Sequence, residues 1–260
     1  MVRAGYSTDL TDRQFEIIQK YLPLPSKMGR PRLYALREIL NAIFAIFYLV
    51  HTGCQWRELP HDFPKWASVY SYFRKWKQDE TWFLIKQAVH TDLRQDQGKN
   101  AEPSAVMIDS QSVKASQMAE TRGVDGNKKV KGRKRHMVTD TLGFPLIVKV
   151  HDANLSDGKQ SVSIFQTLFL WFASIKLVWA AAYRGDLADY LWCAFQCRLE
   201  IAPTLKSKGF QVVPKRWIIE RTFGWFQWDR RLMIDYERQA QLAETMVYIA
   251  SIRKMLNRYK

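Results

Sequence analysis

The sequence contains little cysteine: Cys54, Cys193 and Cys197 are the three in a chain of 260 residues. A small, odd number in a chain of this length argues against a disulfide framework. Cys193 and Cys197 are four residues apart, so a helix would carry both on one face. We expect them to be buried, because zinc sites normally bring two such pairs or paired histidines.

Long hydrophobic runs are also missing. The longest apolar run, Ala42 to Val50, is too short to cross a bilayer. The first residues, MVRAGYSTDLTD, lack the apolar segment of a signal peptide. These absences argue against a membrane protein or a secreted one, and we expect a soluble, cytoplasmic protein.

Acidic residues are outnumbered by basic ones. The chain has 40 Lys and Arg against 25 Asp and Glu, a formal net charge of +15 at pH 7. This excess favours a polyanionic partner, because each neutralised phosphate releases condensed counterions. A basic membrane-surface protein could carry a similar charge, but it usually brings an amphipathic or lipidated anchor, which the sequence does not show. Nucleic acid is therefore the favoured partner.

Residues 1–98 are predicted to form helices. Thr11 and Gln14 have the spacing of a capping box, and the amphipathic stretch that follows ends at Pro23. A second helix is expected from Leu36, and a third, basic and aromatic, from about Ser68. This succession resembles a helix-turn-helix DNA-binding module. The alternative is an all-helical packing domain with a solvated charged face.

A basic turn, Gly29-Arg30-Pro31-Arg32, lies between the first two predicted helices. Arginines in such a turn can enter a narrow minor groove of DNA. An ordinary basic loop has the same composition, so the turn leaves both interpretations open.

The hydrophobic period changes after a polar segment, Arg94 to Ser104, which we interpret as a linker. Asp140-Thr141-Leu142-Gly143 predicts a hairpin between two strands. Strands are expected at residues 105–109, 136–139, 145–150, 175–179 and 199–202, with helices starting near residues 157, 187, 216 and 242. This order fits a mixed sheet flanked by helices, and it is the order of the RNase H-like fold. We predict an α/β protein in which an RNase H-like domain, residues 99–260, follows an all-helical DNA-binding module.

Two acidic residues are candidates for chemistry. Asp109 ends a predicted buried strand, where a carboxylate can be held rigidly at a cleft as a metal ligand requires, although an acid there could also cap a turn. Glu220 lies on a predicted helix that brings Arg216 and Trp217 near it. An isolated Glu in such a helix would more often form a salt bridge. Taken together, Asp109 and Glu220 look like half of a metal site.

Basic residues concentrate in the same part of the chain. In residues 128–135, six of eight side chains are cationic, and the run leads directly into a strand. Charge runs are usually solvated surface, but this density beside an acid suits a track for phosphates. We expect DNA contacts from Lys128, Lys129, Lys131, Arg133, Lys134, Arg135, Arg216, Arg221, Arg230 and Arg231.

These motifs resemble the DDE transposases of bacterial insertion sequences, specifically insertion sequence family 5. The resemblance extends from about Tyr6 to Arg258, including a helical leader. It is carried mainly by Asp109-Ser110-Gln111-Ser112-Val113-Lys114, by KKVKGRKRHMVTDTL at 128–142, and by residues 216–223 and 230–237.

The resemblance implies a site in which two Asp and one Glu hold two Mg²⁺ or Mn²⁺ ions for displacement at phosphorus. Asp109 would be the first acid and Glu220 the third, each a catalytic residue and a metal ligand. Water would cut the element's end, and the freed 3′-hydroxyl would then attack target DNA. The implied partners are double-stranded DNA, as terminal repeats and as target, and a second copy of the chain in a homodimer on DNA. The implied location is the nucleoid of a bacterial cytoplasm.

The chain departs from the family at the second Asp. Family members carry a pattern like Trp-Ala-Asp-x-x-Tyr-x-Gly at this position. This chain has Trp179-Ala180-Ala181-Ala182-Tyr183-Arg184-Gly185, which has one residue fewer between the Trp and the Tyr and no acid. Losing a bridging carboxylate should weaken metal binding and loosen its geometry. We therefore expect an impaired enzyme.

Nearby acids offer a replacement for the missing Asp. The candidates are Asp152, Asp157, Asp186 and Asp189, although Asp157 is better explained as a helix cap. A second functional hypothesis is a catalytically inactive DNA-binding derivative that occupies element ends or represses transposition.

Overall fold

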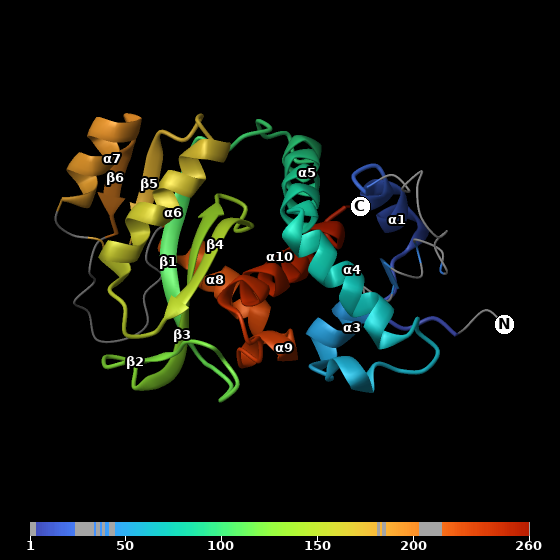
Figure 1. The fold of residues 1–260 in the computed structure, drawn as a ribbon. Coiled ribbons are helices and arrows are strands. Elements are labelled where there is room, and N and C mark those ends of the chain that lie inside the picture. The colour runs from blue at the N-terminus through green and yellow to red at the C-terminus, as the bar shows by residue number, and fades with distance from the viewer. Residues whose placement is uncertain are drawn as a thin grey trace.

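The computed structural model describes residues 4–23, 34, 37, 40–41, 45–180, 183, 186–202 and 215–259. Helices come first along the chain, and a sheet with further helices follows (Figure 1). The helices are α1 (Asp12–Gln19), α3 (Ala45–Thr52), the short 3-10 helix η1 (Trp56–Glu58), α4 (Trp66–Gln78), α5 (Thr81–Asp96), α6 (Asp157–Trp171), α7 (Leu187–Phe195), α8 (Arg216–Gln227), α9 (Arg230–Met233) and α10 (Ala240–Leu256). The strands are β1 (Ala105–Lys114), β2 (Gly123–Asp125), β3 (Val130–Asp140), β4 (Pro145–Asp152), β5 (Leu177–Ala180) and β6 (Arg198–Ile201).

The strands form one mixed sheet in the order β2-β3-β1-β5-β6, with β4 also paired to β3. Strand β3 is antiparallel to β1, β2 and β4, whereas β5 is parallel to both β1 and β6. An antiparallel meander joined through its first strand to two parallel strands is the RNase H-like arrangement. The predicted fold class is confirmed.

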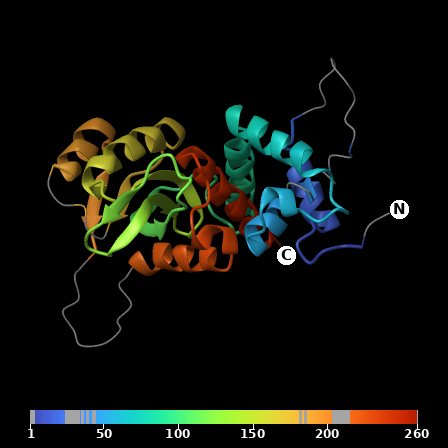
Figure 2. The same cartoon turned by 60° about the horizontal axis from the view of Figure 1, so that its bottom comes forward.

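Successive residues of β1 face opposite sides of the sheet. Val106 and Ile108 belong to the core beneath α6 and α7, whereas Met107 belongs to the core shared with α8 and α10. Figure 2 shows α6 and α7 on one side of the sheet and α8 on the other. By the same alternation Asp109 faces α8, and Ser110 faces the side of α6.

The pairing of β1 with β3 is held at Gly132, which lies opposite Lys114. A Cβ atom at Gly132 would stand 2.0 Å from the carbonyl oxygen of Val113. Any other residue would therefore force the two strands apart, so the sequence needs glycine here.

The N-terminal helices pack on the last helix of the chain. One hydrophobic core includes Ile18 of α1, Phe73 of α4, Ile85 of α5, Val247 of α10 and Met107 of β1. In Figure 1, α4 and α5 lie beside α10. The boundary predicted between residues 98 and 99 falls in the loop after α5, and this core extends across it.

The prediction that Arg94 to Ser104 is a linker is wrong for its first residues. Helix α5 continues to Asp96, and Arg94 is buried, with its Nη1 atom 2.5 Å from Oδ2 of Asp140. The polar composition was misleading because a buried ion pair, and not solvent, satisfies this side chain.

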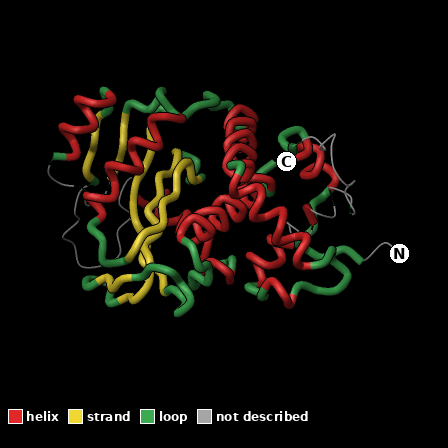
Figure 3. Tube along the Cα trace, viewed as in Figure 1, coloured by secondary structure: helices red, strands yellow, loops and turns green. Residues whose placement is uncertain are grey.

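The strands are longer than their apolar runs (Figure 3, yellow). Strand β1 continues past Asp109 to Lys114, and β3 begins at Val130, so part of the basic run is itself strand. Backbone pairing between β1 and β3 continues where the side chains become polar, because the peptide groups still need partners. The separate helices α5 and α9 and the short strand β2 were not anticipated from the sequence.

Several N-terminal predictions can be compared with the structure. The capping box of α1 is confirmed: Gln14 N lies 3.2 Å from Thr11 Oγ1, and Thr11 N lies 3.1 Å from Gln14 Oε1. The basic turn Gly29-Arg30-Pro31-Arg32 lies outside the described residues. The helix predicted from Leu36 is described in part: α3 (Ala45–Thr52) forms its last turns and ends before Gly53 as predicted, whereas residues 36, 38–39 and 42–44 lie outside the described residues.

Two further expectations concern cysteine and membranes. Cys197 is buried as predicted, but Cys193 is exposed, because α7 ends at Phe195 and the two do not share a helical face. Within the ranges described above, none of the helices is both long enough and apolar enough to cross a membrane.

Candidate active site

Asp109 lies in the middle of β1 on the face toward α8. Its side chain is 20% exposed, so it is held by the sheet and still reaches the surface. Burial raises the pKa of Asp109, and the hydrogen bond from Ser110 N with the nearby cations Arg216 and Lys128 opposes that rise. An acid in this position is rigid and costly to ionise without a cation beside it.

Glu220 lies on α8 and meets Asp109 through a shared cation. The Nε atom of Arg216 is 2.9 Å from Glu220 Oε1 and 3.9 Å from Asp109 Oδ2. Its N–H is not aligned for a hydrogen bond to either oxygen, so the contacts are ionic. The two acids predicted from distant parts of the sequence therefore converge on one positive charge.

Helix α8 is fixed to the turn between β3 and β4. The Thr222 hydroxyl lies 2.6 Å from the carbonyl oxygen of Gly143, and Arg221 Nη2 donates to the carbonyl oxygen of Leu142 at 2.8 Å. Gly143 has a φ of 89°, a conformation that side chains other than glycine rarely adopt. These contacts position Glu220 relative to the sheet.

Asp140 organises the same turn from inside. Its Oδ1 atom accepts from the backbone N–H groups of Leu142 and Phe144, both at 3.0 Å, while Oδ2 contacts Arg94 and His90. Burial opposes ionisation of Asp140, yet the His90 contact, the Phe144 N–H and Arg94 hold its pKa below the ordinary value. Sequence reasoning identified the turn but missed this role of its acid.

The end of β5 reaches the position next to Asp109. The last pair of the parallel β1–β5 ladder joins Ile108 to Ala180, the residue that precedes the expected place of the second acid. Ala181 and Ala182 lie outside the described residues, as do Arg184 and Gly185. The sequence itself provides no carboxylate between Trp179 and Tyr183.

The nearby acids suggested as replacements occupy other places. Asp157 accepts a hydrogen bond from Ser110 Oγ at 2.7 Å and pairs with Lys134 Nζ at 2.9 Å, on the side of β1 away from α8. Asp157 is the first residue of α6, and the N-cap residue of that helix is Ser156. The prediction that Asp157 caps the helix is therefore wrong. Asp186 and Asp189 lie at the start of α7.

The residues predicted to contact DNA divide into exposed and buried groups. Lys128, Lys129, Lys131 and Arg230 are exposed, and Lys134, Arg216 and Arg221 are partly so. Lys128 reaches the part of β1 next to Asp109, where its Nζ lies 3.3 Å from the carbonyl oxygen of Ser110. In contrast, Arg133, Arg135 and Arg231 are buried.

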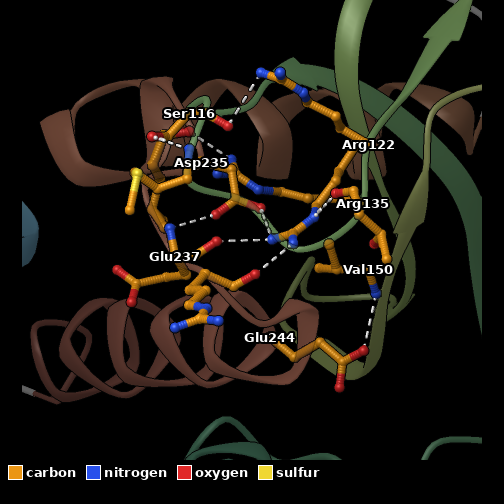
Figure 4. Close-up of polar contacts among 12 residues, drawn as sticks. Ser116, Arg122, Arg135, Val150, Asp235, Glu237 and Glu244 are labelled. Atoms are coloured by element: carbon orange, nitrogen blue, oxygen red, sulfur yellow. Dashed lines mark hydrogen bonds and ion pairs between the residues drawn. The ribbon is translucent and has the colours of Figure 1, made fainter.

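The buried arginines bind the protein's own oxygens. Arg133 Nη1 lies 3.1 Å from Asp235 Oδ2 and 2.9 Å from the carbonyl oxygen of Glu237, and Arg231 Nη2 lies 2.7 Å from Glu237 Oε1. Arg135 donates to the carbonyl oxygen of Leu232 at 2.5 Å. Figure 4 shows Asp235 and Glu237 facing this cluster. Arg133 and Arg135 thus tie β3 to α9 and to the segment after it, while Arg231 ties α9 to that same segment, which the charge pattern alone did not indicate.

Aromatic and cationic side chains alternate along one side of α8. The guanidinium of Arg221 lies 4.6 Å from the ring centre of Trp217 and 4.7 Å from that of Trp225, and Arg258 lies 5.3 Å from Trp225. Trp217 is 41% exposed. Cation–π contacts of this length hold Arg221 between the two tryptophans and Arg258 against Trp225.

Two family models match the chain, one over the N-terminal helices and one over the sheet and the helices that follow β1. Residues 100–253, more than half of the chain, match the family model of the transposase DDE domain. Residues 10–85 match a family described as "Putative transposase of IS4/5 family". Neither the curated proteins nor the solved structures gave a match. The sheet order, the paired acids on β1 and α8 and the two family matches agree: the chain belongs to the DDE transposases of the insertion sequence 4/5 type.

Proposed function

We propose that this chain binds the ends of an insertion sequence and that Asp109 and Glu220 hold divalent metal for cutting and joining DNA there. The observation that carries the proposal is the convergence of both carboxylates on Arg216, at 3.9 and 2.9 Å. A guanidinium between two carboxylates stands where a metal cation would be attracted. Two hard oxygen donors suit Mg²⁺ or Mn²⁺, which take carboxylate together with water and phosphate oxygens.

The acids and their surroundings have separable roles. Bound metal would supply charge stabilisation for the attacking and leaving oxygens. Asp109, fixed in the sheet, and Glu220, fixed through Thr222 to the β3–β4 turn, would set the position of that metal. Lys128 and Arg216 lie beside the acids and would contact the phosphates of the DNA strand being cut.

Apart from Arg216, the DNA contacts are proposed for exposed cations. Lys128, Lys129 and Lys131 precede or open β3, and Arg230 opens α9. The predicted contribution of Arg133, Arg135 and Arg231 would be indirect, since their guanidinium groups bind the protein interior.

We further propose that this copy is impaired. The β1–β5 ladder ends at Ile108 and Ala180, directly before the place where the family carries its second acid, and the sequence continues there with two alanines. With one carboxylate fewer, two metal ions would be held weakly, and the charge of Arg216 would compete for the remaining pair. The same observation favours the second candidate function, a derivative that binds element ends without cutting them.

The deciding experiment supplies the full chain with the DNA flanking its own reading frame, in Mg²⁺ or Mn²⁺, and measures 3′-end cleavage. Little or no cleavage is expected from the natural chain. Insertion of an Asp after Ala180 should raise cleavage, and adding Asp109→Asn to that variant should abolish it. A gel-shift assay of the natural chain on the same DNA separates an impaired enzyme that still binds from a protein that does neither. Efficient cleavage by the natural chain would contradict the proposed impairment.

A further inference from the structure

A second polar cluster lies on the side of β1 away from Asp109. Ser110 pairs with His136 across β1 and β3, so their side chains point to the same face. His151 of β4 and Asp157 of α6 complete the cluster. Ligand atoms of His136, His151 and Asp157 all lie within 4.8 Å of one another. Three separate elements thus bring two imidazoles and one carboxylate together.

The two imidazoles have the spacing of ligands on one ion. His136 Nδ1 lies 3.4 Å from His151 Nε2. Bonds of about 2.0–2.1 Å in tetrahedral geometry place two nitrogen ligands of zinc about 3.4 Å apart. An ion could therefore enter between the rings with little movement of either.

The other nitrogen of each ring is already held. His151 Nδ1 lies 3.1 Å from the carbonyl oxygen of Asp152, which can only accept, so the proton is on Nδ1 and the lone pair of Nε2 faces the cluster. His136 Nε2 contacts the hydroxyl of Tyr183, whose oxygen can accept a hydrogen bond from Nε2–H when Nδ1 binds a cation. Metal-binding histidines characteristically have such an outer partner, because it fixes the ring and its tautomer.

The protonation state suits the same role. Burial lowers the pKa of His136 to about 3 and lowers that of His151 as well. Both rings are thus neutral near pH 7, and a metal does not have to displace a proton from either.

Lys134 is the competing cation. Its Nζ lies 2.9 Å from Asp157 Oδ1, while Ser110 Oγ donates to Asp157 Oδ2 at 2.7 Å. The ammonium neutralises Asp157 in the absence of metal. A dication entering the cluster would replace it at one carboxylate oxygen, and the side chain of Lys134, which is 11% exposed, would turn outward.

We propose that His136, His151 and Asp157 form a binding site for one zinc ion, distinct from the acid pair Asp109 and Glu220. Two imidazoles and one carboxylate leave a fourth tetrahedral position for water, and imidazole nitrogen selects zinc over magnesium. The ion would link β3, β4 and the start of α6 on the face that supports β1.

The test is a zinc titration of the full chain by calorimetry in excess Mg²⁺, with Co²⁺ absorption as a second readout of tetrahedral nitrogen coordination. One equivalent is expected. His151→Gln, at a half-buried position, and Asp157→Asn should each weaken binding by more than about tenfold. Lys134→Gln keeps all three ligands and removes the competing charge, so it should bind zinc at least as tightly as the natural chain.

Matched controls separate this site from the rest of the protein. The double variant Asp109→Asn/Glu220→Gln should retain the equivalent of zinc, as should Cys193→Ser. No saturable zinc binding would overturn the proposal. So would zinc binding that survives His151→Gln and is lost in the double variant, because the ion would then belong to the acid pair. Circular dichroism of each variant confirms that the comparison is made on folded protein.

Discussion

The hydroxyl of Thr222 lies 2.6 Å from the carbonyl oxygen of Gly143, and this contact joins the helix of Glu220 to the turn between β3 and β4. The same hydroxyl lies 3.0 Å from the carbonyl oxygen of Ile218 in its own helix. One proton cannot serve both oxygens fully, so the shorter contact to the turn is the one that anchors α8.

Replacing Thr222 with valine should therefore destabilise the protein and displace Glu220. The buried Gly143 carbonyl would lose its side-chain donor, at a cost of about 1–3 kcal/mol in the free energy of unfolding. Urea unfolding measures this loss. Thr222→Ser keeps the hydroxyl and should recover most of the stability; if serine is as damaging as valine, the hydrogen bond is not the anchor.

Arg216 should compete with metal for the two acids. In Arg216→Gln the bridging charge is gone, and Mg²⁺ or Mn²⁺ affinity without DNA should rise by about two- to fivefold, the equivalent of an exposed ion pair of up to about 1 kcal/mol. Calorimetry in the absence of DNA checks this. Arg230→Gln, which removes an exposed charge elsewhere, serves as the control. Weaker metal binding in Arg216→Gln would show that the guanidinium assists the metal instead of opposing it.

Arg133 and Lys131 lie two residues apart on β3 but should respond differently to substitution. Arg133→Met leaves Asp235 buried without its cation and should lower the free energy of unfolding by about 3–5 kcal/mol. Lys131→Met should change it by less than about 0.5 kcal/mol. In DNA binding, Lys131→Met is expected to reduce the slope of log K against log salt concentration by about one, because one phosphate contact is lost. Equal stability losses in the two variants would contradict the assignment of Arg133 to the interior.

His136 should make the protein sensitive to acid. Its pKa in the folded chain is about 3, below the ordinary value of about 6.5 expected in the unfolded chain. Between these values the unfolded chain holds a proton that the folded chain does not, so stability is lost as pH falls from about 6.5. The slope contributed by this one group approaches about 1.4 kcal/mol per pH unit.

Urea midpoints in metal-free buffer at several pH values measure that slope. His136→Gln should flatten it, whereas His61→Gln, at an exposed position, should leave it in place. An unchanged slope in His136→Gln would assign the acid sensitivity to another group.

The sequence predicted the order of the strands and the two acids because both leave local signals. The hydrophobic period changes near residue 100, the turn at Gly143 is typical of a hairpin, and Asp109 follows an apolar run. The partners of the arginines leave no such signal. In the sequence Arg133 resembles its neighbours in a cationic run. The buried carboxylate that pairs with it, Asp235, is brought alongside β3 only by the fold.

The same distinction explains the extra helix and the histidine cluster. Arg94 resembles linker sequence because its partner, Asp140, lies in a distant hairpin. His136 and His151 lie on the two strands of the predicted hairpin, but their meeting depends on the register, which places His151 opposite Lys134, and Asp157 joins them only when α6 packs on this face. Local patterns predict elements, whereas long-range electrostatic pairs depend on how the elements meet.

The glycine at position 132 has a consequence for how faithfully β1 must pair. Because its missing Cβ is what lets the two backbones approach, a slip of one residue would bring Lys131 or Arg133 to the crowded point opposite Lys114. The same slip would turn Asp109 toward the histidines and Ser110 toward α8. The absence of a side chain at Gly132 thus fixes the register that keeps Asp109 on the face of α8 and Ser110 on the face of the histidines.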